Sequence, residues 1–311
     1  MPNFVHLHLH TEYALVDSLI RIKPLVKAVR KAGMPACAVT DYSNLFALVK
    51  FYRAAQSEGI KPIIGVDMRL HQGTEPASRL VLLCQNDIGY RNLTRLVSRS
   101  YTEGQENNVP YLHRQWLNGA TEGIIALSGG CEGEIGQALL AEQPLLAKQR
   151  LDDFKSLFPQ RFYIELQRTG RHHEEEYIHA AVELALETGI PVVATNEVCF
   201  LNRYDFESHE VRVCIHDSNI LADKNRPHRY SEQQYLRTPQ EMAELFSDIP
   251  EAIENTWLIA QRCNLELTLG KNFLPDFPIP EGETVEEYFR NQARIGLEQR
   301  LAFLFDRTTE K

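Results

Sequence analysis

The segment FVHLHLHTEY, residues 4–13, decides how the rest of the chain is interpreted, because it holds three of the 11 histidines at alternate positions. A β-strand points alternate residues to the same face, so an extended segment here places His6, His8 and His10 on one side. Neutral imidazole is a good ligand for zinc and for manganese- or iron-like ions. The segment therefore predicts the first part of a metal site, to be confirmed by its structural context.

Length and composition describe an ordinary globular chain. The 311 residues allow one large α/β barrel or two smaller domains, with 43% hydrophobic and 24% charged residues. No apolar run approaches the roughly 20 residues of a membrane span, and residues 1–10 lack the features of a signal peptide. Six cysteines without CxxC pairs fit a reducing cytoplasm. The net charge of −9 makes the chain a poor primary clamp for nucleic acid.

Short apolar segments alternate with helical patterns as far as residue 195. Strands are expected at 36–40, 61–68, 79–83, 123–130, 162–166 and 191–195, and helices at 24–31, 45–57, 86–101, 145–158 and 173–188. This alternation predicts βαβ units and a parallel sheet. About seven strands that each end in polar residues favour a closed α/β barrel, and no GxGxxG or GxxxxGK[ST] motif follows the first strand.

Reactive groups of a parallel α/β barrel lie at the carboxyl ends of its strands. Most residues at the predicted ends are possible metal ligands or acid–base groups. They are His8, His10, Asp41, Asp67, Cys131, Gln167, Arg168, Asn196, Glu197 and Cys199. Their convergence predicts a site at one end of the barrel.

The character of the chain changes after residue 201. Helical patterns at 208–216, 239–246 and 250–263 flank a polar stretch, and a proline-punctuated segment at 272–278 precedes an amphipathic helix at 285–305. We therefore expect one domain over residues 1–270. Residues 271–311 are interpreted as a linker and the truncated beginning of the next domain.

Several sequence blocks carry a resemblance to a known family. FVHLHLHTEY, VTDYSNLFALVKFY, IKPIIGVD, NDIGYRNLTRLVS, PVVATNEV and FLPDFPIP resemble the N-terminal PHP (polymerase and histidinol phosphatase) domain of bacterial DNA polymerase III alpha subunits, in the family's order. The resemblance implies a distorted seven-stranded (β/α) barrel of the PHP type, followed by the start of a palm domain. It also implies a parent chain that is a DNA-directed DNA polymerase, a nucleotidyltransferase whose catalytic aspartates lie outside these 311 residues.

Active PHP domains bind up to three metal ions and hydrolyse phosphoesters, a reaction in which clustered metals generate a hydroxide nucleophile. The resemblance places ligand positions at His8, His10, Asp17, Asp67, Cys131, Glu197 and Cys199. Family histidines are lost at Tyr42, Arg79 and Arg168. A phenol with a pKa near 10 is a weak ligand, and arginine cannot deprotonate.

These departures predict a vestigial site without catalytic residues. Arg79 and Arg168 are expected to pair with Asp17, Asp67 or Glu197 in place of the metals. No cofactor is required, and any residual divalent ion (Zn, Mn or Mg) is expected on His8, His10 and Asp17.

The resulting hypothesis is a structural and partner-docking module that serves DNA replication in the cytoplasm. Its expected partners are the remainder of the alpha subunit, the proofreading exonuclease subunit and other replicase subunits. DNA is reached only through the full-length chain, and no membrane is involved. The alternative is an active metal-dependent phosphoesterase or 3'-5' exonuclease that uses His8, His10 and Asp17. A more distant alternative, an amidohydrolase-type barrel, lacks the bridging lysine or the additional histidines after later strands.

Overall fold

The computed structural model describes residues 3–71, 77–223, 225–272, 274–275 and 277–305. The chain divides into two units, Met1–Glu266 and Leu267–Lys311, and each is described by itself. Within the described ranges, no helix has the length and apolar character that crossing a membrane requires.

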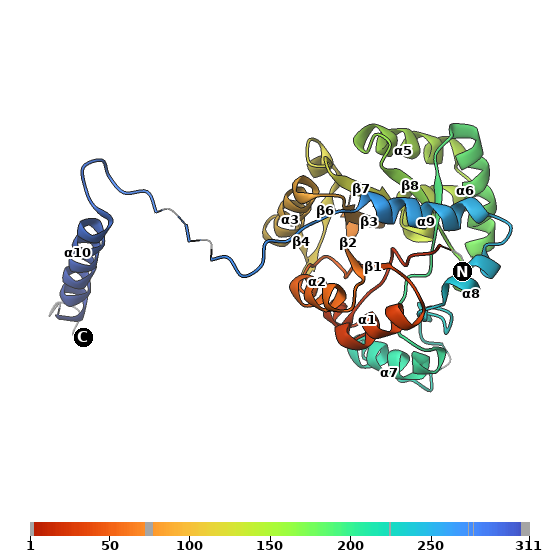
Figure 1. Cartoon of the computed structure of the whole chain (residues 1–311), viewed down its shortest axis with the longest axis horizontal. Coiled ribbons are helices and arrows are strands. Elements are labelled where there is room, and N and C mark those ends of the chain that lie inside the picture. Colours follow the sequence, from red (N-terminus) through yellow and green to blue (C-terminus); the bar gives the residue numbers. More distant parts are fainter. Residues whose placement is uncertain (1–2, 72–76, 224, 273, 276, 306–311) are drawn as a thin grey trace. The chain divides into compact units, whose positions relative to one another are not determined.

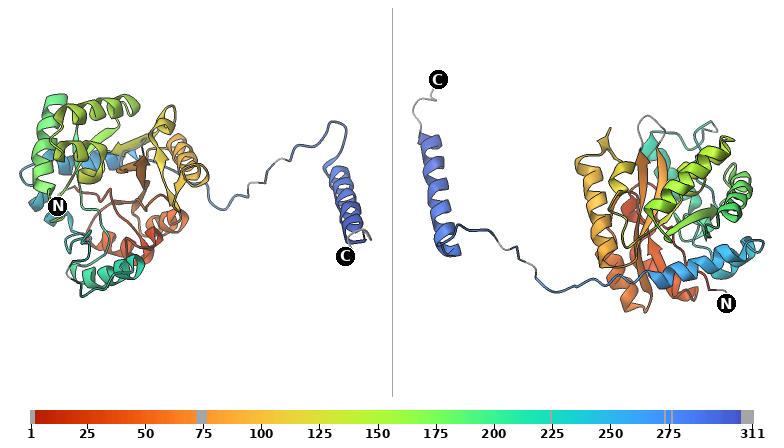
Figure 2. Two further views of the ribbon diagram at one scale, coloured as in Figure 1. Left: turned by 180° about the vertical axis from the view of Figure 1, so that it is seen from behind. Right: turned by 90° about the horizontal axis from the view of Figure 1, so that it is seen from above.

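The first unit is built around a curved sheet with the strand order β1-β2-β3-β7-β8-β9, in which β6 also pairs with β2. Helices lie around the outside of this sheet (Figures 1 and 2). Strand β1 pairs in parallel with β2, and β8 pairs in parallel with both β7 and β9. The strands are β1 (Ala36–Val39), β2 (Lys61–His71), β3 (Ser78–Cys84), β6 (Leu112–His113), β7 (Ile124–Leu127), β8 (Phe162–Gln167) and β9 (Val192–Thr195).

The N-terminal segment closes the sheet into a barrel. The backbone amides of Ala38 and Thr40, in and just after β1, each donate to a carbonyl of residues 6–10 at 2.8 Å. On the other side of the segment, the amide of Val198, which follows β9, donates to the carbonyl oxygen of His8 at 3.1 Å. The carbonyl oxygen of Val198 accepts from the amide of His10 at 2.9 Å. Both edges of the sheet therefore hydrogen-bond to this segment, and the predicted distorted seven-stranded barrel is confirmed.

The segment is not the regular strand that the alternation predicts. Ala38 donates to the carbonyl of His6, whereas Thr40 donates to the carbonyl of Leu9. The partners on the N-terminal segment, His6 and Leu9, are therefore three residues apart, whereas Ala38 and Thr40 are two residues apart. This is the arrangement of a β-bulge with one extra residue. A bulge shifts the side-chain alternation, so the histidines on its two sides need not share a face.

The three histidine side chains accordingly contact different partners. The Nε2 atoms of His8 and His10 lie 3.0 and 3.2 Å from Asp67 Oδ2. The Nε2 atom of His6 instead lies 2.8 Å from the carbonyl oxygen of Arg237. The prediction that all three histidines contribute to one face is wrong for His6.

Strand β3 also differs from the prediction, because it runs antiparallel to both β2 and β7. Residues 72–77 separate β2 from β3, fewer than the roughly dozen residues that a crossover between parallel strands needs. The first residues of β3 therefore lie at the same end of the barrel as the last residues of the parallel strands. This direction is what brings Arg79 to the mouth of the barrel.

Nine helices of the described first unit agree with most of the expected periodicity, except that the short α4 was not predicted. They are α1 (Ile22–Lys31), α2 (Leu48–Ser57), α3 (Asp87–Thr102), α4 (Glu134–Leu140), α5 (Pro144–Leu157), α6 (Glu174–Thr188), α7 (Phe206–Asp217), α8 (Pro239–Leu245) and α9 (Pro250–Arg262). Shorter elements are η1 (Glu12–Ala14), η2 (Arg114–Leu117), η3 (Gly130–Glu132), η4 (Arg203–Asp205), β4 (Gln105–Glu106) and β5 (Val109–Pro110).

Helix α9 covers the end of the barrel opposite the mouth. Its Ile259 and Ala260 belong to the same buried apolar cluster as Ala36, Ile63 and Val193, which lie in the first halves of their strands. Burying apolar side chains from water is the main favourable contribution to folding. One half of the barrel is thus filled by apolar residues, and polar groups collect in the other half.

The second unit contains α10 (Val285–Phe305), which confirms the helix expected there. Thr284 and Glu287 begin it with a capping box, in which the Thr284 amide donates to Glu287 Oε2 at 3.1 Å and the Glu287 amide to Thr284 Oγ1 at 3.3 Å. The assignment of residues 1–270 to a PHP domain and of residues 271–311 to the start of a palm domain stays a prediction.

Candidate functional site

His8, His10 and Asp67 form a compact group at the mouth of the barrel. All three side chains are buried, and one ligand atom from each lies within 4.8 Å of the other two. They come from the N-terminal segment and from the interior of β2, where Asp67 is the one charged residue among buried apolar neighbours. Two imidazoles and a carboxylate are a donor set that could hold a transition-metal ion.

Arg79 already contacts this group. Its guanidinium donates through Nη2 to Asp67 Oδ2, and its Nη1 lies 2.5 Å from Glu197 Oε1 and 2.6 Å from Glu132 Oε2. Its Nη2 lies 3.4 Å from His8 Nε2. A guanidinium stays charged at every physiological pH. The residues therefore do not fit a multi-metal centre, because a fixed cation contacts the carboxylate and the imidazole that would bind the ion.

Two carboxylates of this network, Asp67 and Glu197, are held in the ionised state. Burial opposes their charge, but Arg79 and hydrogen bonds from His10 and His8 hold the pKa of Asp67 well below its ordinary value. Burial likewise opposes the charge of Glu197, whose pKa is lowered mainly by the guanidinium of Arg171 and then by Arg79. The site is thus a buried network of paired charges.

Glu165 is a member of the site that sequence reasoning missed. Its Oε1 lies 2.7 Å from His8 Nδ1, and it also accepts hydrogen bonds from Thr195 Oγ1 at 2.6 Å and the Gly129 amide at 3.1 Å. Burial would lower the pKa of His8, but Glu165 and Asp67 raise it to about 10. Each N–H of this imidazolium thus has a carboxylate partner, and a metal ion would have to displace one of the two protons. The signal in the sequence was a glutamate inside an otherwise apolar strand, since carboxylates are seldom buried without a partner.

Arg168 does not enter the site. It donates to Glu175 Oε1 at 2.9 Å and to Asp248 Oδ1 at 2.6 Å, and its guanidinium lies 5.0 Å from the centre of the Phe246 ring. Successive strand residues point to opposite faces, and Gln167 faces His8 with Nε2 3.4 Å from its Nδ1. Arg168 therefore points away from the interior, and the prediction that it replaces a metal is wrong.

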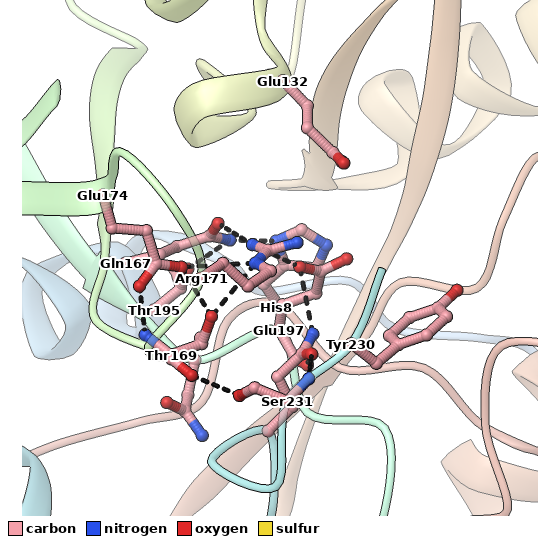
Figure 3. A network of polar contacts seen from close by, with 12 residues as sticks. His8, Glu132, Gln167, Thr169, Arg171, Glu174, Thr195, Glu197, Tyr230 and Ser231 are labelled. Atoms are coloured by element: carbon pink, nitrogen blue, oxygen red, sulfur yellow. Dashed lines mark hydrogen bonds and ion pairs between the residues drawn. The ribbon is translucent and has the colours of Figure 1, made fainter. Parts of the chain in front are cut away.

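Arg171, three residues later, is the second arginine of the network. It lies 2.8 Å from Glu197 Oε2 and 3.2 Å from Glu174 Oε1, and it donates to Gln167 Oε1 at 2.9 Å. Figure 3 shows its guanidinium between these partners. Glu174 in turn accepts from the amides of Thr169 and Gly170, which fixes the turn after β8. This turn, rather than the strand, positions the arginine.

Asp17 lies at the same mouth but outside the group of possible ligands in the described part of the chain. Its carboxylate accepts a hydrogen bond from the Tyr230 hydroxyl, and its carbonyl oxygen lies 3.1 Å from His209 Nε2. Tyr230 belongs to the stretch between α7 and α8. The expected use of Asp17 as a third ligand beside His8 and His10 stays a prediction. Among the described residues, Asp67 is the carboxylate grouped with the two histidines.

Other predicted site residues contact neighbouring groups of the protein. The ring of Tyr42 lies edge-on to His10 with the centroids 4.3 Å apart. Cys199 is buried, and its Sγ donates to the carbonyl oxygen of Glu197 at 3.3 Å. Burial raises the pKa of the Cys131 thiol to about 12 and that of Cys199 well above its ordinary value. Neither thiol belongs to the group of possible ligands among the described residues.

The fold and site define a distorted (β/α) barrel with buried polar groups at its mouth. Residues 6–169 match the PHP domain family, and the chain belongs to it. The predicted resemblance is therefore confirmed.

Individual relatives extend the similarity beyond the matched domain. The chain is 54% identical to DNA polymerase III subunit alpha of Pseudomonas aeruginosa over 99% of its own length and 26% of that protein. It is 47% identical to the same subunit of Escherichia coli over 100% of its length and 27% of that protein. The chain thus spans about a quarter of these relatives.

A solved structure assigned as a metal-dependent phosphoesterase from Bifidobacterium adolescentis covers 63% of this chain. This chain matches 88% of that protein with 12% identity and a TM-score of 0.45.

Proposed function

We propose that this chain is the PHP portion of a replicative DNA polymerase alpha subunit and that it serves DNA replication as a structural and partner-docking module. The similarity to polymerase III alpha subunits over nearly the whole chain supports this role. Its proposed partners are the remainder of the alpha subunit, a proofreading exonuclease subunit and other replicase subunits. The proposed location is the cytoplasm, and nucleotidyl transfer is assigned to the parent chain rather than to these residues.

The bridging position of Arg79 is the observation that carries the structural role. One guanidinium contacts Asp67 on β2, Glu197 after β9 and Glu132 in η3. These residues lie on separate elements around the mouth. Metal ions in an active PHP site would tie such elements together, and here an arginine that belongs to β3 does so. Because the guanidinium is part of the chain, these paired and hydrogen-bonded contacts form without a bound metal ion.

The same position argues against hydrolysis. Metal-assisted hydrolysis requires an ion that lowers the pKa of a bound water and so creates a nucleophile. Arg79 supplies positive charge and hydrogen-bond donors, but a guanidinium does not coordinate water. His8 is protonated between Glu165 and Asp67 and cannot act as a general base at neutral pH.

Metal analysis tests the loss of the hydrolytic site. Purified protein incubated with zinc or manganese and then desalted is expected to hold less than roughly a tenth of an equivalent, as would an Arg168→Ala control. Stoichiometric metal, together with hydrolysis of a model phosphodiester that His8→Ala abolishes, would show that the site is active.

Co-purification with the proofreading exonuclease subunit tests the docking role. We expect a complex at micromolar concentration that also forms with Arg168→Ala. Absence of binding at that concentration would overturn the docking proposal and leave the structural role of Arg79 intact.

A second candidate function is a metal-dependent phosphoesterase or 3'-5' exonuclease. The specific observation in its favour is the closeness of the ligand atoms of His8, His10 and Asp67. One divalent ion (Zn, Mn or Mg) would have to displace the guanidinium of Arg79 from Asp67. The metal measurement described above separates this candidate from the first.

A further inference from the structure

A second pair of histidines lies outside the network at the barrel mouth, where β2 and β6 end. His71 on β2 and His113 on β6 are direct partners in the parallel register of these two strands. Such partners project to the same face of a sheet, and the centres of the two rings lie 5.8 Å apart. Both line a pocket of about 560 Å³, which among the described residues shares no lining residue with the pocket that Arg79 and Glu197 line.

The ring nitrogens of this pair are open to a ligand. In the ranges that the structure describes, neither imidazole has a hydrogen-bond partner, and Glu106 Oε1 lies 3.9 Å from His71 Nε2. Aromatic neighbours hold the rings, because the Tyr111 ring centre is 5.5 Å from that of His71 and the Trp116 ring centre 4.6 Å from that of His113. Groups that are already held in place lose less entropy when they bind.

The spacing of the two rings suits a shared metal ion. Zinc binds imidazole nitrogen at about 2.0–2.1 Å, so the centres of two rings on one tetrahedral ion lie roughly 5 Å apart. The rings of His8 and His10 are 5.3 Å apart by the same measure. The slightly wider separation of His71 and His113 can be closed by rotation about the last side-chain torsion, which is broad in histidine.

The charges around this pair differ from those around His8. Among the described residues, no lysine or arginine forms an ion pair or hydrogen bond with either ring. Arg114 lines the same pocket, but it pairs with Glu134 and, at 3.1 Å, with Asp153. A divalent ion on His71 would therefore meet the carboxylate of Glu106 rather than a fixed cation.

We propose that His71 and His113 bind one zinc ion or a similar divalent transition metal, with Glu106 as the third ligand and water in the remaining position. Imidazole and carboxylate together are a donor set that such ions accept. The three residues lie on β2, β6 and β4, so the ion would connect these strands. The proposed function does not depend on this site.

The affinity is expected to be in the micromolar range, because only two imidazoles and one exposed carboxylate contribute. An ion held this weakly dissociates quickly and is lost on desalting, so binding must be measured at equilibrium. The desalted protein is therefore expected to hold little metal even though this site exists.

Calorimetric titration of the 311-residue chain with zinc chloride tests the site. We expect saturable binding of one equivalent that weakens at least about tenfold in His71→Gln and in His113→Gln, since each variant loses one of two imidazoles. Glu106→Gln is expected to weaken binding less. His172→Ala removes an exposed histidine that lies just before α6 and is expected to bind as the unchanged protein does.

Tryptophan fluorescence gives a second measurement of the position of the ion. Nickel(II) binds imidazole and quenches indole fluorescence at short range. Because Trp116 lies beside His113, nickel is expected to cause saturable quenching that His113→Gln abolishes and His172→Ala does not. Quenching that is the same in His113→Gln would contradict the site.

Absence of saturable zinc binding below millimolar concentration would overturn the proposal. Binding that is unchanged in both His71→Gln and His113→Gln would also overturn it and would assign the ion elsewhere, such as the group of His8, His10 and Asp67. That result would bear on the proposed function instead. Far-ultraviolet circular dichroism of the glutamine variants, expected to match the unchanged protein, separates loss of binding from loss of folding.

Discussion

Arg79 and Arg168 occupy two regions of the barrel mouth that differ in burial more than in contacts. Each guanidinium bonds to at least two carboxylates, and the two side chains are 11% and 13% exposed. The partners differ, because Asp67 and Glu197 are 0% and 1% exposed whereas Glu175 and Asp248 are 60% and 57% exposed. Similar ion pairs therefore have different consequences when they are broken.

The difference arises from what happens to the carboxylates. Removing one partner of a buried pair leaves an uncompensated charge in a low-dielectric interior, whereas water readily solvates an exposed carboxylate. Arg79 is thus predicted to be essential to the barrel, whereas the ion pairs of Arg168 are predicted to contribute little. Four measurements would sharpen or break this comparison.

The largest effect is expected for Arg79→Ala. It leaves Asp67 and Glu197 buried with fewer partners, and the free energy of unfolding should fall by about 3–5 kcal/mol. Urea denaturation of the variant and the unchanged protein measures the loss. Arg79→Lys, which preserves one charge, should lose less. A fall below about 1 kcal/mol for Arg79→Ala would remove the distinction between the two regions.

The second effect is a loss of stability at alkaline pH. The folded-state pKa of His8 is raised from 6.5 to about 10. Its contribution is therefore fully present below pH 6.5 and is lost as the pH rises toward 10. The loss should be on the order of a few kcal/mol, because each pKa unit corresponds to about 1.4 kcal/mol.

Urea denaturation across this pH range, compared with His8→Gln, isolates the contribution of the imidazolium. The variant should show a flatter dependence of stability on pH. Equal slopes would mean that His8 is neutral in the fold and that its charge does not belong to the network.

A smaller effect is expected for Tyr230→Phe, which removes the hydroxyl that donates to Asp17. Loss of a hydrogen bond to a charged group should lower stability by about 1.5–3 kcal/mol. Hydrogen exchange is expected to accelerate in residues 225–235. Unchanged exchange there would show that this contact does not hold the stretch between α7 and α8 against the mouth.

The smallest effect is expected for Arg168→Ala. Its carboxylate partners are solvent-exposed, so the loss from these ion pairs should be about 0–1 kcal/mol and should shrink further as salt is added. The same denaturation series at low and high ionic strength measures it. A loss comparable to that of Arg79→Ala would show that this rim pair is as important as the buried network.

Much of the barrel could be predicted because its pattern is local. Alternating apolar strands and amphipathic helices identified β1, β2, β7, β8 and β9, and the amphipathic pattern at 285–305 identified α10. Strand direction could not be predicted for β3, since its apolar pattern is the same whichever way the strand runs. The bulge before Leu9 was also hidden, because the alternation of histidine with apolar residues continues through it without a break.

For the candidate site, the sequence by itself determined the His8-Leu9-His10 pattern and the membership in the PHP family. It also predicted the replacement of family histidines by Tyr42, Arg79 and Arg168. Only the tertiary structure decided that Arg79 and Arg171 enter the network, that Arg168 does not, and that Glu165 pairs with His8. The physical reason is that resemblance to a family assigns a residue only to a position along the chain. The direction of a side chain depends on strand register and turn geometry, and these are set by contacts between residues far apart in sequence.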